Sequence, residues 1–181
     1  MGATLTLTES QTSKTAPIGA DDLCRLYAQD VCRFAAIMAR PQDAEDLAQE
    51  ALLRAVRSLG TFDASRGSMG AWLWRIVANA ARDAAGRRQR LRDLVIRVGV
   101  LAPRQSETVE ETALTRIRDA QLHAQIRLLP LRDRTLIALR YGAGLDAREV
   151  GDVVGLSAES ASRALHRARA RLRARVEDIH Q

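Results

Sequence analysis

From Asp21 onward, apolar residues recur every three or four positions, the spacing of one face of an α-helix. The repeat is interrupted at Pro41, in the glycine-containing segment 60–70, and again at Gly142 and Gly144. It predicts amphipathic helices over about 21–40, 43–59, 71–92 and 130–141, with a further helical pattern that starts near Ala113. The residues expected to face the core in the first three helices are Leu23, Leu26, Tyr27, Val31, Phe34, Ala35 and Met38; Leu47, Ala51, Leu52, Ala55 and Val56; and Leu73, Ile76, Val77, Ala80 and Ala84.

Two segments lack this periodicity. Residues 1–20 are rich in Thr and Ser and contain Pro17, a composition typical of a flexible tail. Residues 95–112 contain Gly99 and Pro103 followed by Gln, Ser and Glu residues, which favours a linker between domains. The pattern therefore predicts an all-α protein in which two small helical domains, residues 21–94 and 113–181, are joined by a flexible linker.

The stretch from Asp146 to Val176 has the pattern of a helix-turn-helix. Asp146, with Glu149 three residues later, forms the capping-box signature of a short helix. Gly155 provides the left-handed residue that commonly ends such a helix, and Ser157 can cap the next one. The second helix is expected to bury a narrow stripe, which consists of Ala161, Leu165, Ala168, Leu172 and Val176.

The opposite face of this second helix carries Ser160, Arg163, Arg167 and Arg171. The segment from Arg163 to Arg175 contains six arginines and no acidic residue. The alternative to a binding surface is a solvated helix whose arginines only face water. Such surfaces usually mix charges of both signs. Because polar groups and arginines on a capped helix suit the major groove, the pattern favours DNA binding.

Composition and charge also favour a nucleic-acid partner. The formal net charge is +6, and all but one of the 28 Lys and Arg residues are Arg. The guanidinium group forms forked contacts with phosphate and with guanine. A GC-rich genome is an alternative source of the many Ala and Arg residues. An anionic membrane is the competing partner, but no segment combines a long apolar face with a basic one. Without a run of eighteen apolar residues or a signal peptide, we expect a cytoplasmic protein that does not bind membranes.

Residues that could support catalysis or metal binding are sparse. His123, His166 and His180 are scattered, and neither a glycine-rich phosphate loop nor a nucleophile motif is present. Cys24 and Cys32 would lie about 12 Å apart along one helix, too far for a disulfide, so we expect reduced, partly buried thiols. The sequence predicts no catalytic activity, no metal site and no cofactor.

Three segments, in this order and spacing, resemble the extracytoplasmic-function (ECF) class of bacterial RNA polymerase sigma factors. They read QDAEDLAQEALLRAV (42–56), AWLWRIVANAARDAAGRRQR (71–90) and LLPLRDRTLIALRYGAGLDAREVGDVVGLS (128–157), the last followed by the arginine-rich helix. The resemblance covers roughly Asp21 to Glu177. It implies a specificity subunit that binds the largest-subunit coiled coil and the flap of core RNA polymerase, together with promoter DNA both as duplex and as melted single strand. Many relatives are held inactive by an anti-sigma factor, but nothing in this sequence identifies one.

The resemblance assigns a polymerase-docking role to the outward face of the helix over 43–59. Acidic and amide side chains there surround one leucine, which suits a basic protein partner. The alternative for the first acids is that they only complement the helix dipole. The docking candidates are Asp43, Asp46, Gln49, Glu50 and Leu53.

The same resemblance assigns opening of the minus-ten element to the helix over 71–92 and to the loop before it. An aromatic ring, an amide and arginines on one face can stack on, hydrogen-bond to and neutralise an unpaired strand. The candidates are Phe62 and Arg66 in the loop; Trp72, Arg75, Asn79 and Arg82 on the face; and Arg87, Arg88 and Arg90 as phosphate contacts. Trp72 is equally suited to a core position, whereas Trp74, followed by Ala78 and Ala81 on its own face, is expected in the core.

For the minus-thirty-five element, the resemblance implies base reading at the start of the arginine-rich helix and phosphate contacts farther along. The candidates are Ala158, Glu159, Ser160, Ser162 and Arg163 for bases, and Arg167 and Arg169 for phosphates. The chain departs from the usual family pattern because its arginine is displaced by one position, about 100° around the helix. Two other classes remain open: a stand-alone helix-turn-helix regulator, and a protein-interaction module that uses a sigma-like fold as a decoy.

Overall fold

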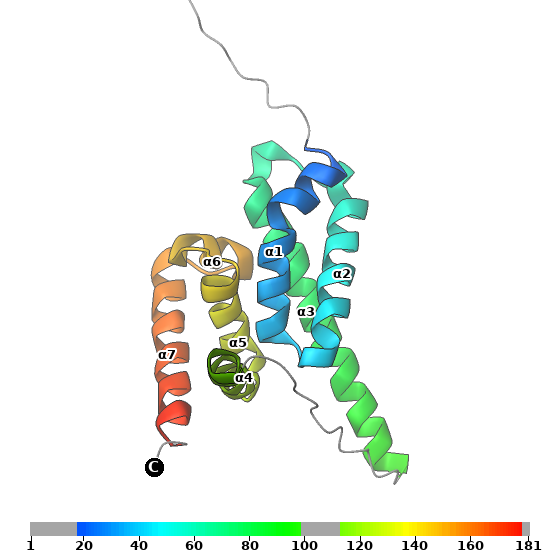
Figure 1. Cartoon of the computed structure of the whole chain (residues 1–181). Coiled ribbons are helices and arrows are strands. Elements are labelled where there is room, and N and C mark those ends of the chain that lie inside the picture. The colour runs from blue at the N-terminus through cyan, green and yellow to red at the C-terminus, as the bar shows by residue number, and fades with distance from the viewer. Residues whose placement is uncertain (1–17, 99–112, 179–181) are drawn as a thin grey trace, which may run out of the picture.

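The computed structural model describes residues 18–98 and 113–178, and this part of the chain is helical (Figure 1). Most of the expected tail and linker, residues 1–17 and 99–112, lies outside the described residues, as do residues 179–181. The elements are α1 (Ala20–Met38), α2 (Pro41–Ser58), η1 (Leu59–Thr61), η2 (Ala64–Arg66), α3 (Met69–Val98), α4 (Ala113–Arg127), α5 (Leu131–Ile137), η3 (Ala138–Gly142), α6 (Ala147–Val154) and α7 (Ala158–Glu177). The prediction of an all-α protein is confirmed for the described residues.

Helices α1, α2 and α3 form the N-terminal unit, whose core agrees with the apolar pattern. Phe34 and Trp74 are buried at its centre, with ring centroids 5.6 Å apart. Leu26 is the exception, since 59% of it is exposed. Leu26 follows Leu23 by three residues, which rotates it about 60° away from the side on which Val31 and Phe34 lie.

Helix α3 is longer than predicted. The helix was expected to end at Arg92 and the linker to begin at Val95, but α3 continues to Val98. The physical reason is that no glycine or proline lies between Arg92 and Gly99. The last turns of α3 project beyond the bundle at the lower right of Figure 1, where Leu91, Leu94 and Ile96 are exposed.

Helices α4 to α7 form the C-terminal unit. The helix predicted over 130–141 begins at Leu131, one residue later, with Pro130 as its N-cap. Residues 138–142, which form η3, adopt the wider π-helical hydrogen-bonding pattern. Apolar side chains from each of its elements are buried in the core, and the largest of them are Leu136, Ile137, Leu139 and Val150.

The two units pack against each other and share one apolar core. Helix α1 contacts η3, α4 and α5, and α3 contacts α6. At the centre of this contact, Gly142 lies directly on the backbone of Phe34, and Arg33 Nε donates a hydrogen bond of 3.3 Å to the Gly142 carbonyl. The apolar pattern shows which residues are buried, but it does not show that residues of different units are buried against each other.

Other expectations concern single residues and special sites. Both cysteines are free; Cys24 is half-buried as expected, but Cys32 is exposed, so the prediction of a partly buried thiol is wrong there. Within residues 18–98 and 113–178, no helix combines the length and the apolar character needed to cross a membrane. The same residues contain no group of three or more metal-ligating side chains that could hold an ion.

Candidate nucleic-acid and polymerase interfaces

The loop between α2 and α3 holds an aromatic pair at the surface. Asp63 caps η2, because its carboxylate accepts hydrogen bonds from the Ser65 hydroxyl at 2.7 Å and the Ser65 amide at 2.9 Å, and these bonds lower the pKa of Asp63. The loop places Phe62 against Trp72, edge to face, with ring centroids 5.8 Å apart. Both rings are half-buried, so their remaining surface can accept a base.

The exposed face of α3 continues from this aromatic pair. Arg75, Asn79 and Arg82 are all exposed and follow Trp72 at steps of three and four residues. Arg66 of the loop and Arg87 farther along α3 are exposed as well. Trp74 is only 2% exposed, which confirms its predicted core position. The structure thus brings the aromatic, amide and basic groups predicted for strand binding onto one side of the N-terminal unit.

Arg88 is placed differently from the other predicted phosphate contacts. Its side chain is only 23% exposed, and its Nη2 donates to Asp43 Oδ2 at 2.8 Å. The same carboxylate oxygen accepts a bond of 2.7 Å from Arg40 Nε. Burial, followed by the nearby positive charges of Arg40 and Arg92, lowers the pKa of Arg88. In this conformation Arg88 therefore joins α3 to the start of α2, which the sequence did not predict.

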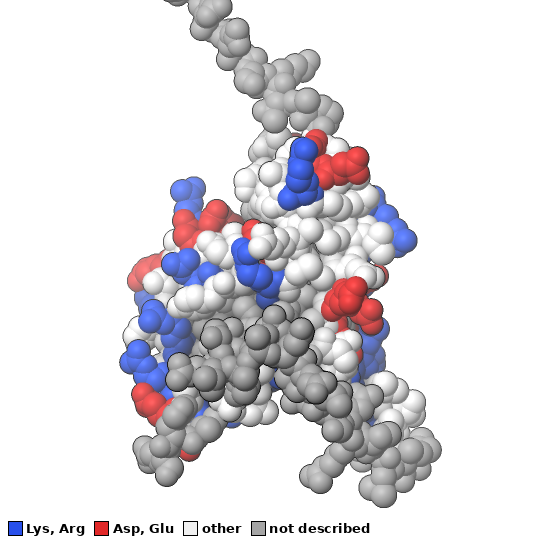
Figure 2. Space-filling model, viewed as in Figure 1, with Lys and Arg blue, Asp and Glu red and all other residues white. Residues whose placement is uncertain are grey.

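The predicted docking face of α2 separates into exposed and paired residues. Asp46, Gln49 and Leu53 are exposed, and red side chains lie over α2 on the right of Figure 2. Glu50 instead accepts a bond of 2.7 Å from Arg54 Nε, and Arg54 Nη1 donates to Asp83 Oδ2 at 2.7 Å.

The Arg54–Asp83 ion pair joins α2 to α3, whereas the Arg54–Glu50 pair lies within α2. The hydrogen bonds that Arg54 donates to Asp83 and to Glu50 raise the pKa of Arg54, and the bond from Arg54 lowers the pKa of Asp83. Glu50, like Asp43, therefore has a structural partner. Asp46 and Leu53 are exposed, and Gln49 is exposed but donates from Nε2 to Glu45 Oε1 at 3.1 Å within α2.

The helix-turn-helix has the predicted caps. The Glu149 amide donates to Asp146 Oδ1 and the Asp146 amide donates to Glu149 Oε2, each at 2.8 Å, which confirms the capping box. Gly155 ends α6 in the left-handed region, with φ 73° and ψ 39°. The Ser157 hydroxyl caps α7 by accepting a bond of 3.2 Å from the Ser160 amide.

One residue of this motif was missed. A Cβ on Gly151 would lie 2.6 Å from the carbonyl oxygen of Leu156, and the Leu156 amide donates to the Gly151 carbonyl at 2.9 Å. The turn therefore approaches α6 too closely for any side chain at position 151. A glycine inside a short helix, where it costs stability, was the available signal.

Most predicted base-reading residues lie at the exposed start of α7. Ala158, Glu159 and Ser162 are exposed, and Arg163 Nη1 donates to Glu159 Oε1 at 2.6 Å. Ser160 is half-buried, and its hydroxyl accepts a bond of 2.9 Å from the Ser157 hydroxyl. Arg167 is exposed on the same side, and Figure 2 shows basic side chains along α7 on its left edge.

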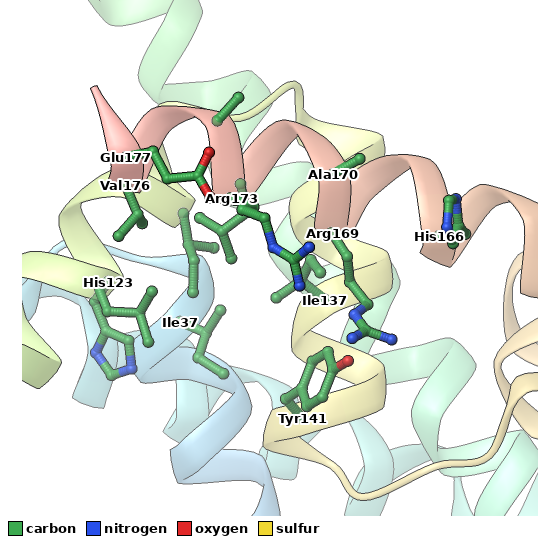
Figure 3. A pocket seen from close by; sticks show the side chains of 14 residues that line it. Ile37, His123, Ile137, Tyr141, His166, Arg169, Ala170, Arg173, Val176 and Glu177 are labelled. Atoms are coloured by element: carbon green, nitrogen blue, oxygen red, sulfur yellow. The ribbon is translucent and has the colours of Figure 1, made fainter. Parts of the chain in front are cut away.

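Two arginines of α7 have other surroundings. Arg171 is exposed, as expected, and it also forms an ion pair with Asp133, a buried residue of α5. Arg169 is rotated about 200° from Arg167. In Figure 3 it extends with Arg173 toward Tyr141, over a groove of about 1050 Å³. The groove is bounded by α7, α4, α1 and the α5–η3 segment, and its apolar lining includes Ile37, Leu122, Ile126, Ile137 and Leu172.

Comparison with known families matches each unit separately. The family model described as Sigma-70 region 2 matches residues 23–91, which hold the α2 face, the loop and most of α3. The model described as Sigma-70, region 4 matches residues 126–174, which hold α5, η3, α6 and most of α7. Together the two models cover well over half of the chain.

Curated relatives have matching names. The chain is 31% identical over 159 residues to the ECF RNA polymerase sigma factor SigE of Mycolicibacterium smegmatis, which covers 84% of this chain and 60% of that protein. It is 24% identical over 174 residues to the ECF RNA polymerase sigma factor SigW of Bacillus subtilis, covering 87% and 89%. It is 34% identical over 123 residues to the RNA polymerase sigma-H factor of Pseudomonas aeruginosa, covering 62% of each. The chain thus spans about three fifths of the length of the first and third of these relatives.

Solved structures share the fold. The sigma factor RpoE of Bartonella quintana, in complex with the anti-sigma factor NepR, superposes with a TM-score of 0.68 at 21% identity, over 87% of this chain and 96% of that one. CnrH, in complex with the cytosolic domain of CnrY, superposes with a TM-score of 0.63 at 23% identity, over 88% of both chains. At these identities the likeness concerns the fold.

Proposed function

We propose, because the chain belongs to the extracytoplasmic-function class of RNA polymerase sigma factors, that it binds core RNA polymerase and directs it to specific promoters. The observation that carries the proposal is that one chain holds both an exposed face of aromatic, amide and basic side chains on α3 and a capped helix-turn-helix. A stand-alone helix-turn-helix regulator uses only the second of these. A decoy module has no use for either set of exposed arginines.

At the minus-ten element, the α3 face would hold the melted strand. Extruding a base from the duplex costs a few kcal/mol. Stacking on the Phe62–Trp72 pair and hydrogen bonds from Asn79 can offset this cost, since stacking on an aromatic ring contributes about 1–3 kcal/mol per base. Arg75 and Arg82 would neutralise the phosphates next to the extruded base. Opening then draws on binding energy alone, and we propose that the chain has no catalytic activity of its own.

At the minus-thirty-five element, α7 would enter the major groove with its N-terminal turns. Arg163 must then exchange its carboxylate partner, Glu159, for a base or a phosphate, which is feasible because both side chains are exposed. Arg167 would contact the phosphate backbone. We place this activity in the cytoplasm, where bacterial RNA polymerase and the chromosome meet.

For docking on core polymerase, we propose that Asp46, Gln49 and Leu53 form the centre of the interface, with Asp43 and Glu50 at its edge. The test is an affinity measurement between core polymerase and the variant Asp46→Arg. The matched control is Asp152→Arg, which makes the same charge change at an exposed acid of α6 in the other unit. We expect Asp46→Arg to weaken association by about tenfold or more, as truncation at the centre of an interface does.

The control should bind as the wild type does, and circular dichroism should show unchanged helix content in both variants. Equal affinity of Asp46→Arg and wild type would refute the docking assignment.

An inhibitory partner is a second proposal. RpoE and CnrH were each solved in complex with another protein, NepR and the cytosolic domain of CnrY. The groove under α7 has an apolar lining and carries Arg169 and Arg173, so it suits an amphipathic helix with acidic residues. A fluorophore attached through Ala174→Cys, in a chain whose free Cys24 and Cys32 are replaced by Ser, should change its emission when an inhibitor of transcription by this chain binds. Inhibition with unchanged emission would contradict this placement.

A further inference from the structure

The first two turns of α7 carry a hydrogen-bonded pair of opposite charges. Arg163 Nη1 donates to Glu159 Oε1 at 2.6 Å, and 59% of the Arg163 side chain and 77% of the Glu159 side chain are exposed. The acidic residues of α7 are Glu159 and Glu177, so Glu159 is the acid at the end that would enter the major groove. A carboxylate there repels phosphate, so it does not add to the general affinity for DNA.

The other candidate base readers at this end offer less to a base edge. Ala158 carries only a methyl group. Ser160 is half-buried, and its hydroxyl accepts a bond of 2.9 Å from the hydroxyl of the capping residue Ser157. Ser162 is exposed but short. The ion pair is therefore the feature of this end that combines reach, charge and exposure.

The start of α7 is held in place from both sides. The Ser157 hydroxyl caps it, and the turn before it packs so closely on α6 that a Cβ at Gly151 would lie 2.6 Å from the Leu156 carbonyl oxygen. Two turns beyond the ion pair, Arg171 bonds to Asp133 of α5. The helix thus presents its charged pair in a fixed orientation relative to the rest of the C-terminal unit.

We infer that Glu159 and Arg163 together read a single G·C base pair of the minus-thirty-five element, an inference that rests on the function proposed for α7. Arg163 donates to guanine O6 and N7, and Glu159 accepts from the N4 amino group of the paired cytosine. In a G·C pair, O6 and N4 are hydrogen-bonded to each other and lie about 2.9 Å apart. Because Arg163 Nη1 and Glu159 Oε1 are 2.6 Å apart, the two charges can exchange each other for the two bases with little movement.

Other ligands satisfy only part of the opened pair. Each charge must find a new partner, because a polar group left without one in an interface is costly. A phosphate suits Arg163 but repels Glu159. An A·T pair offers Glu159 the N6 amino group and Arg163 the O4 carbonyl, but thymine carries its methyl group where guanine has a second acceptor. The G·C pair satisfies both side chains.

The test is selection of bound sequences from a library of randomised duplexes by the full chain at low salt, where phosphate contacts are strong. The informative variants are Arg163→Ala and Glu159→Ala. Their matched controls are Arg167→Ala, which removes the same charge from an expected phosphate contact, and Glu177→Ala, at an exposed acid near the other end of α7.

We expect the wild type to prefer G·C over A·T at one position by about thirtyfold, as a good base contact does. Arg163→Ala should remove this preference, and Glu159→Ala should lower it about fivefold because the cytosine amino group is then unread. Glu177→Ala should keep the preference, and Arg167→Ala should keep it while weakening binding to all sequences. The inference is overturned if no position selects G·C, or if Glu159→Ala selects it as strongly as the wild type. The second result is expected if Glu159 only complements the dipole at the start of α7.

The selection requires no polymerase, so its outcome is distinguishable from that of the proposed function. A chain that selects G·C through both residues but starts no transcription with core polymerase upholds the inference and contradicts the sigma-factor function. Initiation at defined promoters without selection of G·C by these residues overturns the inference and leaves the sigma-factor function intact.

Discussion

Substitution of Gly142 by alanine should separate the two units without unfolding either of them. A Cβ at position 142 would lie 3.0 Å from Phe34 Cα, 3.0 Å from Ile37 Cδ1 and 3.1 Å from Phe34 N, whereas ordinary van der Waals contact begins at 3.4 Å. All three atoms belong to α1, on the other unit. The added methyl group therefore clashes across the interface and not inside its own unit.

The magnitude follows from which of these atoms can move. The end of the Ile37 side chain can rotate away, but the backbone of Phe34 can move only if α1 shifts as a whole. Over-packing of this kind costs about 1–3 kcal/mol, which lowers the ratio of packed to separated molecules roughly 5- to 150-fold. Loss of the bond from Arg33 Nε to the Gly142 carbonyl adds to the effect.

The assay is small-angle X-ray scattering with limited proteolysis of the segment between the units. A compact chain of this length has a radius of gyration near 16 Å, and Gly142→Ala should raise the measured radius above that of the wild type while helix content stays constant. The matched control is Gly86→Ala, whose Cβ would meet only the flexible end of Arg90 at 3.6 Å. Scattering curves of Gly142→Ala that coincide with those of the wild type would show that the glycine contact does not hold the units together.

Four further predictions concern single sites. Gly151→Ala puts a Cβ 2.6 Å from a carbonyl oxygen of the turn and should destabilise the C-terminal unit by about 1–3 kcal/mol, measured by urea unfolding; an unchanged midpoint would contradict the close approach. Asn79→Ala should reduce transcription from duplex templates more than from templates already mismatched at minus ten, and equal losses would count against a role in opening. If α7 neutralises about four phosphates, log affinity for duplex DNA should fall with log salt at a slope near −3.6, and Arg167→Ala should flatten it by about one; an unchanged slope would remove Arg167 from the phosphate contacts. Asp83→Asn removes the ion pair with Arg54, which in the wild type lowers the pKa of Asp83 below its unfolded value of about 3.9. The loss of stability relative to wild type should therefore be complete above about pH 5 and should vanish as pH falls through the folded pKa. It should stay below about 1 kcal/mol because the pair is exposed.

The helices and their caps were predictable because their signals are local. The apolar repeat located α1, α2 and the body of α3, and the spacing of Asp146 and Glu149 specified the capping box before α6. Trp74 was recognisable as a core residue because the alanines that share its face leave room for close packing. Each of these features depends on residues within one or two turns of each other.

The remaining features depend on contacts between distant parts of the chain. Arg88 and Arg171 are arginines at the helical spacing expected of DNA contacts. Their side chains nevertheless bind Asp43 and Asp133, which lie 45 and 38 positions away in the sequence. The contact of Gly142 with Phe34 joins the two units across more than a hundred residues, and no periodic pattern encodes it. The pattern therefore predicted helix faces on which most candidate DNA and docking residues are exposed, but it did not predict which of their charges are already paired.

The central claim is tested most directly by in vitro transcription with purified core RNA polymerase and fragments of the genome that encodes this chain, followed by mapping of the transcript ends. We expect the chain to induce initiation at a limited set of start sites that share paired elements near minus ten and minus thirty-five, and expect the core enzyme alone to initiate at none of them. Tight binding of the chain to duplex DNA without any polymerase-dependent initiation would contradict a sigma-factor function.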